Sequence, residues 1–145
     1  MELIHFHDED TAFKLQKPTL IRHWIRQIIS LENYHLTALN YIFCSDSYLH
    51  QLNLSYLHHD NFTDVVTFDY KEEHANNIEA DIFISVDRVK ENARNFEVKF
   101  YAELTRVMIH GLLHLMGYND KNPKEQKVMR KKEEACLSLL EQIKS

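Results

Sequence analysis

Three side chains between residues 110 and 120, in the stretch HGLLHLMGYND, could together bind a metal ion. His110 and His114 are one helical turn apart, so both imidazoles leave the same face of a helix and can reach one cation. Gly117 allows the chain to turn back after that helix, and Asp120 can then return to the same point. Carboxylate oxygen is an accepted zinc ligand, and three protein ligands with one open position are typical of a catalytic zinc site. The pattern HxxxHxxGxxD therefore predicts one divalent metal ion, with Zn²⁺ favoured, bound by His110, His114 and Asp120.

Both glycines of the chain lie in this same stretch. A glycine inside a helix costs about 1 kcal/mol relative to alanine, so Gly111 needs a reason for its position. The alternative to a metal site is that the histidines are hydrogen-bonded core residues and that Asp120 only begins a loop. The ligand spacing and the scarcity of glycine together favour the metal.

Positive charge beside the metal would be needed to hold a substrate anion. Helical projection brings Arg106 near the two histidines, which makes it a further catalytic candidate, although it could instead pair with Glu103 at i,i+3. Lys121, Lys124 and Lys127 follow Asp120 and could form a basic rim, or simply an ordinary solvated helix face.

Strands and helices are expected to alternate around the histidine-bearing helix. Apolar periodicity predicts strands at 3–6, 38–45, 63–70 and 80–86, and helices at 19–33, 46–56, 87–96, 101–117 and from 123 onwards. Asp46 and Asp87 are expected to cap their helices, and Asn122 before Pro123 marks the start of the last one. This order predicts an α+β (mixed α/β) domain, with a single small mixed sheet of about four strands packed on the central helix and flanking helices.

The last helix is expected to bury an apolar face. Helical spacing predicts that this face consists of Val128, Cys136, Leu139, Leu140 and Ile143.

Composition, cysteine spacing and net charge limit the kinds of protein that this chain could be. Residues 1–145 are expected to form one domain, because no repeat or Pro/Gly/Ser-rich linker marks a boundary. Cys44 and Cys136 have no metal-binding spacing and are expected to be core residues of a reduced protein. We expect a cytoplasmic location, since the sequence has neither a secretory signal nor a long apolar run. The formal net charge of −5 argues against a DNA-coating or membrane-surface protein, so any nucleic-acid contact has to be local.

Three blocks of the sequence resemble those of a known enzyme family. HGLLHLMGYND is similar to HGxLHLxGYDH, the signature of the YbeY family of metal-dependent endoribonucleases. Residues 52–68, LNLSYLHHDNFTDVVTF, resemble that family's LNxxYRxxDxPTDVLSF. The strand EADIFIS at 79–85 resembles its third landmark, an acidic residue before a strand beside the site.

The resemblance implies a metal-bearing helix on a small mixed sheet, a zinc-type ion and cleavage of single-stranded RNA. It also implies a role in 3′ maturation of small-subunit (16S) rRNA and in ribosome quality control. The implied partners are ribosomal RNA and a ribosome or small-subunit protein, with no membrane and no DNA.

Thr63, Asp64 and Ser85 lie on segments that match those of the family. Thr63 and Ser85 become substrate-binding candidates beside Lys121, and Asp64 could orient a histidine by accepting its second N–H or could only cap a strand.

Two departures from the family pattern affect the chemistry. The family's third ligand is histidine where this chain has Asp120, and the harder oxygen ligand makes Mn or Fe more plausible than in an all-histidine site. Leu57 replaces an arginine thought to contact the RNA phosphate, a contact that leucine cannot make. His58 and His59 follow directly and could supply a donor, or they could be ordinary surface histidines.

Two other functional classes stay open at this point. A zinc metalloprotease of the HxxxHxxGxxD type has the same ligand spacing, but Gly111 stands where the HExxH class carries its general-base glutamate. Glycine cannot take up a proton, which weakens the protease alternative. A non-catalytic ribosome assembly factor is the second alternative, favoured by Leu57.

Overall fold

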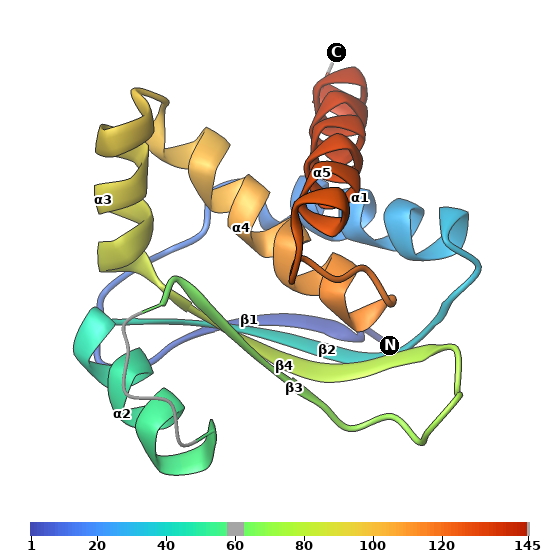
Figure 1. Cartoon of the computed structure of the whole chain (residues 1–145), viewed down its shortest axis with the longest axis horizontal. Coiled ribbons are helices and arrows are strands. Elements are labelled where there is room, and N and C mark those ends of the chain that lie inside the picture. The colour runs from blue at the N-terminus through green and yellow to red at the C-terminus, as the bar shows by residue number, and fades with distance from the viewer. Residues whose placement is uncertain (58–62, 145) are drawn as a thin grey trace.

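The computed structural model describes residues 1–57 and 63–144, in which five helices accompany one four-stranded sheet (Figure 1). The elements in chain order are β1 (Ile4–Asp8), α1 (Pro18–Leu31), β2 (His35–Cys44), α2 (Asp46–Leu57), β3 (Val65–Asp69), β4 (Asn77–Ser85), α3 (Val86–Phe96), α4 (Phe100–Leu115) and α5 (Pro123–Lys144). The predicted α+β class and the four-stranded mixed sheet are confirmed.

The sheet has the strand order β1-β2-β4-β3, with β2 and β4 inside. β1, β2 and β4 run parallel, and β3 pairs antiparallel with β4, Val65 opposite Ile84. The inner strands become continuously buried only towards their C-terminal ends, at Tyr41–Cys44 of β2 and Ile84–Ser85 of β4, while polar and apolar residues alternate nearer their starts. β3, at one edge, contacts α4 on one face of the sheet and α2 on the other.

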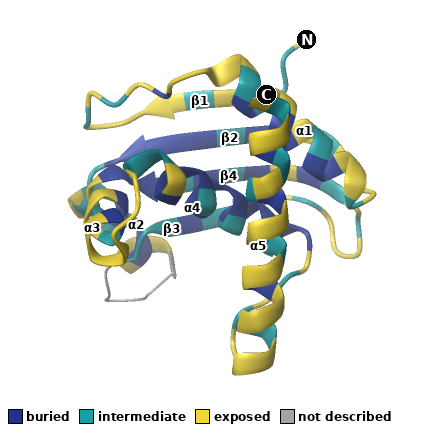
Figure 2. Ribbon diagram, turned by 90° about the horizontal axis from the view of Figure 1, so that it is seen from above, coloured by how far each residue is buried: buried dark blue, intermediate teal, exposed yellow. Residues whose placement is uncertain are grey.

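Helices cover the two faces of the sheet unequally. Figure 1 shows α1, α3, α4 and α5 on one face and α2 alone on the other. The main core lies on the first side, where Trp24, Leu104 and Met108 have no exposed surface, and Figure 2 shows the dark, buried strands behind α4 and α5. A smaller apolar cluster of Cys44, Leu49 and Val66 lies on the α2 side. The layered arrangement makes α4 the central helix and fixes the direction in which its histidines point.

Gly111 is the point of closest approach between α4 and the sheet. A Cβ atom built there would lie 3.1 Å from Ile82 Cγ2 and 3.3 Å from Val65 Cγ2, tighter than ordinary van der Waals contact. The helix can approach β3 and β4 this closely because it carries no side chain at that position. This close packing is the physical reason for a glycine within the most apolar helix of the chain.

Element boundaries and caps differ from the predictions in several places. β2 and β4 begin three residues earlier than expected, since polar residues at their starts still pair. At α2 and α3 the capping side chains are Ser45 and Ser85, whose Oγ atoms accept from the N–H groups of Tyr48 (3.1 Å) and Arg88 (3.0 Å). The predicted caps Asp46 and Asp87 were wrong by one and two residues, because serine directly before a helix caps equally well.

The buried face of α5 also differs from the prediction. Val128 is 49% exposed, and the residues of α5 that are buried are Met129, Glu133, Cys136 and Leu140. The start of α5 is as predicted, because Asn122 Oδ1 accepts the Glu125 N–H at 2.8 Å. Both cysteines are buried free thiols, in agreement with their predicted core positions.

Among the described residues, no helix combines the length and apolar character needed to cross a bilayer.

We predict that Gly111→Val lowers the free energy of unfolding by about 1–3 kcal/mol, because the added methyl groups must push Ile82 and Val65 aside. Urea unfolding followed by far-UV circular dichroism measures the loss. Ala102→Val on the exposed side of the same helix is the matched control, expected to cost no more than about 0.7 kcal/mol from helix propensity. Equal losses in the two variants would contradict the packing explanation.

Candidate metal centre

The turn after α4 is what brings Asp120 back towards the helix. Gly117 has a positive φ of 94° and its N–H donates to the His114 carbonyl at 3.1 Å. The Tyr118 N–H donates to the Leu113 carbonyl, also at 3.1 Å, which completes the two-bond pattern that commonly ends a helix at glycine. Lys71 Nζ donates to the Leu115 carbonyl at 3.2 Å and stabilises the same helix end by its charge.

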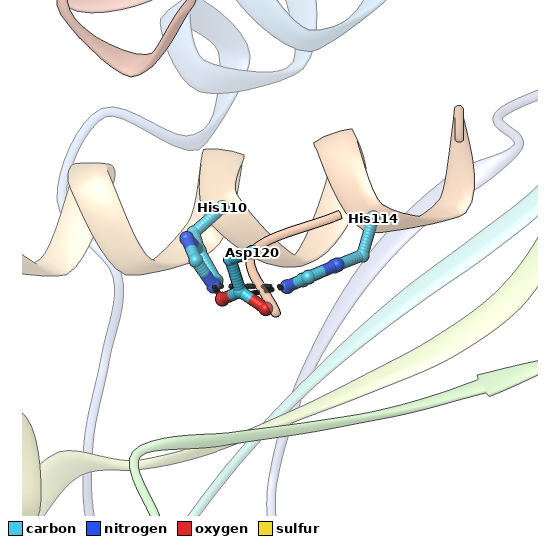
Figure 3. A group of neighbouring side chains, drawn as sticks. All are labelled: His110, His114 and Asp120. Atoms are coloured by element: carbon cyan, nitrogen blue, oxygen red, sulfur yellow. Dashed lines mark hydrogen bonds and ion pairs between the residues drawn. The ribbon is translucent and has the colours of Figure 1, made fainter. Parts of the chain in front are cut away.

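The three predicted ligand side chains meet at one point (Figure 3). His110 Nε2 and His114 Nε2 lie 3.0 Å apart, and Asp120 Oδ2 is 3.3 Å from each of them. Figure 3 shows both rings leaving the same side of α4, with the carboxylate between them. The i,i+4 spacing and the glycine turn therefore place these atoms as the sequence predicted.

This triangle has the dimensions of a metal site. A tetrahedral ion with ligand distances of about 2.0–2.1 Å separates its ligand atoms by about 3.3 Å. The three atoms fit that geometry, and they are the only group of at least three such side chains, among residues 1–57 and 63–144, that could hold an ion. The side chains are between 20% and 39% exposed, so a substrate can reach the site.

A further side chain, Glu133 of α5, contacts His110 of the candidate metal centre. Its Oε2 atom lies 2.5 Å from His110 Nδ1, on the ring side opposite to the ligand nitrogen. Burial acts to lower the pKa of His110, but the hydrogen bond and negative charge of Glu133 outweigh it and raise the pKa above its usual value. Glu133 was not among the predicted site residues. The signal that could have revealed it is a charged residue on the apolar stripe of α5.

Arg106 is surrounded by carboxylates. Its guanidinium contacts Glu103 at 2.6 and 2.9 Å, Glu133 at 3.3 Å and Asp64 at 3.9 Å. The pairing with Glu103, weighed above as the alternative, is thus present. Three acidic side chains around one guanidinium leave the cluster with an excess of negative charge, which disfavours an additional anion there.

Asp64 belongs to this cluster, and its hydrogen-bond partner among the described side chains is Asn92, not His110 or His114. Its carboxylate accepts a hydrogen bond from Asn92 Nδ2 at 3.1 Å, and burial raises its pKa. The carboxylate bonded to His110 is Glu133, so the role suggested for Asp64 belongs to a residue far along the chain.

The predicted substrate-binding residues differ in their accessibility. Lys121 is exposed and directly follows Asp120, while Thr63 is half-buried at the start of the β3 segment. Ser85 has no exposed surface and its hydroxyl is bonded to Asp46 and to the Arg88 N–H, which argues against direct contact with RNA. His58 and His59 lie outside the described residues.

Comparison with known proteins places this geometry in a family. The family model described as Endoribonuclease YbeY matches residues 4–141. The chain belongs to the YbeY family. Since the match extends well beyond the motifs at 52–120, it includes Glu133 and most of α5, up to residue 141.

Two YbeY relatives and one solved structure illustrate the similarity. The chain is 52% identical over 130 residues to the Endoribonuclease YbeY of Amoebophilus asiaticus, covering 90% of this chain and 88% of the relative. It is 51% identical over 138 residues to that of Cytophaga hutchinsonii, covering 95% and 96% respectively. The solution structure of TM1509 from Thermotoga maritima superimposes with a TM-score of 0.65 at 29% identity, covering 94% of this chain and 88% of that one.

We predict that Gly117→Ala weakens the site through the backbone alone, because a Cβ at this position would meet nothing within 4 Å. At a φ of 94° an alanine is strained, so the variant should lose about 1–3 kcal/mol of stability or relax by moving the loop. Urea unfolding and Zn²⁺ titration of the variant measure the two effects. Unchanged stability together with unchanged metal affinity would contradict the proposed role of the turn.

Proposed function

We propose that this YbeY-family protein is a metal-dependent endoribonuclease that cleaves single-stranded RNA, with Zn²⁺ as its ion. The observation that carries the proposal is the convergence of His110, His114 and Asp120 within 4.8 Å of one another, on the motif that resembles the family signature. The names of the relatives support ribonuclease activity, and the donor set of two imidazoles and one carboxylate suits a zinc-type ion.

A bound ion would supply Lewis-acid chemistry and stabilise the charge that develops on a phosphodiester during cleavage. The protein's own contribution is to hold three ligand atoms on a rigid helix end and a short turn, with one side open to solvent. Lys121, next to Asp120, is suited to bind an RNA phosphate, and Thr63 offers a hydroxyl on the matching family segment. Arg106 is a weaker candidate for phosphate binding, because its charge is balanced by neighbouring carboxylates.

The family resemblance also supports a proposal for the biological role. We propose that the substrate is the 3′ region of 16S rRNA precursor, and that the protein works in the cytoplasm with a ribosome or a small-subunit protein. Single-stranded RNA fits an exposed site of this kind, because its phosphates can approach without the protein entering a duplex groove.

The protease alternative loses support from the packing of α4. Gly111 faces Ile82 and Val65 of the sheet, so this position could not present a glutamate to the metal without moving the helix. The relatives named here are endoribonucleases, which agrees with that geometry.

The first test compares metal content and RNA cleavage in the wild type, His114→Ala and Asp120→Ala. We expect about one divalent ion per chain in the wild type and less in both variants, with cleavage of a single-stranded RNA falling at least about 100-fold, since each variant removes one of three ligands. Mass spectrometry of metals in the purified proteins and gel analysis of RNA products provide the measurements.

His23→Ala, which removes an exposed histidine on α1, is the matched control and should change neither quantity. Asp120→His, which restores the family's usual ligand, should keep both the ion and the activity. Full metal content in Asp120→Ala would remove this residue from the ligand set. Full rescue of cells lacking the protein by a metal-free, inactive Asp120→Ala variant would favour the assembly-factor alternative.

A second test concerns Lys121. We expect Lys121→Ala to weaken binding to single-stranded RNA uniformly across sequences and to lower the salt dependence, the slope of log K against log [salt], by about 0.7, as for loss of one phosphate contact. Fluorescence anisotropy at several salt concentrations measures it. Lys90→Ala, an exposed lysine on α3, is the control. An identical slope in wild type and Lys121→Ala would exclude the contact.

A further inference from the structure

Glu133 is an acidic residue at a core position. It shares the buried stripe of α5 with Met129, Cys136 and Leu140, and its side chain is only 7% exposed. An apolar side chain of the same size would satisfy the packing of α5, and a buried carboxylate costs free energy unless both of its oxygens are bonded. The presence of glutamate here therefore calls for a role that an apolar residue could not perform.

Each oxygen of Glu133 has a different partner. Oε1 lies 3.3 Å from Arg106 Nη1, and Oε2 lies 2.5 Å from His110 Nδ1. The contact with the histidine is much the shorter. Arg106 is in addition held at 2.6 Å by Glu103, so it keeps a close carboxylate partner without Glu133. The contact that depends on Glu133 is the one with His110.

The chemistry of this hydrogen bond fixes where the imidazole proton lies. With the Glu133 carboxylate as acceptor, His110 Nδ1 carries the hydrogen of this bond. In the neutral ring Nε2 is then unprotonated, and its lone pair points towards His114 Nε2 and Asp120 Oδ2, 3.0 and 3.3 Å away. A metal ion needs this form of the ring, because a protonated Nε2 cannot bind it.

We infer that Glu133 is a positioning residue that holds His110 in its metal-binding tautomer and orientation, an inference that rests on the metal-binding function proposed above. Carboxylates in this arrangement also make the imidazole a stronger ligand. The metal centre thus includes a residue of α5 as well as the residues of α4 and the turn.

The position of Glu133 is set by the core and not by the site. Trp24 Nε1 donates to the Cys136 carbonyl at 2.7 Å, which ties α5 to α1. Met129 and Leu140 pack in the main core on either side. Because these contacts hold α5 in place, the Glu133 carboxylate already lies beside His110 before an ion binds.

The test uses the full chain and two substitutions of nearly unchanged size. Glu133→Gln keeps an acceptor for the Nδ1 hydrogen but loses the charge, whereas Glu133→Met removes both. We expect Zn²⁺ affinity, measured by competition with a chromophoric chelator, to fall about 10–100-fold in Glu133→Met and less in Glu133→Gln. Long-range ¹H–¹⁵N NMR of the zinc-free proteins should show hydrogen on His110 Nδ1 in the wild type and a substantial Nε2-protonated fraction in Glu133→Met.

Glu103→Gln is the matched control. Glu103 is also a buried carboxylate that pairs with Arg106, but its carboxylate is not bonded to His110 or His114. This variant should keep the wild-type tautomer of His110, and its zinc affinity should stay within about twofold of the wild type. A residue that bonds no metal ligand is not expected to change the affinity of the site. Urea unfolding of all three variants separates loss of the fold from loss of the site.

The outcomes distinguish this inference from the proposed function. Unchanged zinc affinity and tautomer in both Glu133 variants would overturn the inference while leaving the metal site intact. An equal loss in Glu103→Gln and Glu133→Gln would also overturn it, since the effect would then act through Arg106. Failure of the wild type to bind Zn²⁺ would overturn the proposed function and, with it, the inference.

Discussion

The convergence of two imidazoles and a carboxylate depends on how sharply the backbone turns after α4. The turn at Gly117 uses a positive φ and two backbone hydrogen bonds, which return the chain over the last turn of the helix within a few residues. Without this reversal Asp120 would lie beyond the helix end, and the two histidines would offer only two ligands. The backbone conformation of one residue thus converts a pair of side chains into a three-ligand site.

Close packing at the other glycine fixes the direction of the site. Gly111 lets α4 lie against Ile82 and Val65, while the side chains of His110 and His114 stay 20% and 30% exposed. The core on this face, with Trp24 and Met108 fully buried, keeps the helix from rotating. Packing density therefore determines the site geometry, since a small change in helix position would separate the ligand atoms.

Charge is concentrated on the inner side of the metal centre. Arg106, Glu103, Asp64 and Glu133 form one connected group whose net charge is negative when the carboxylates are ionised. Glu133 is the member of this group that contacts a candidate ligand, His110, whereas Glu103 contacts Arg106. An excess of negative charge here disfavours a phosphate. Lys121, which is exposed and directly follows Asp120, does not belong to this group. The acidic group around Arg106 is thus distinct from the three candidate ligands and from the lysine proposed to bind the substrate.

The sequence by itself determined the features that depend on local spacing. The pair His110 and His114 follows from the helical repeat, the turn from Gly117, and the α+β class from alternating apolar patterns. Strand starts, helix caps and the exposed Val128 were less predictable, because pairing and packing extend or shift elements by a few residues. Only the tertiary structure decided that Glu133, 23 residues from His110 along the chain, is its hydrogen-bond partner and that Arg106 is held by carboxylates. Such contacts arise from the docking of α5 on α4, and local periodicity carries no information on which residues of two docked helices meet.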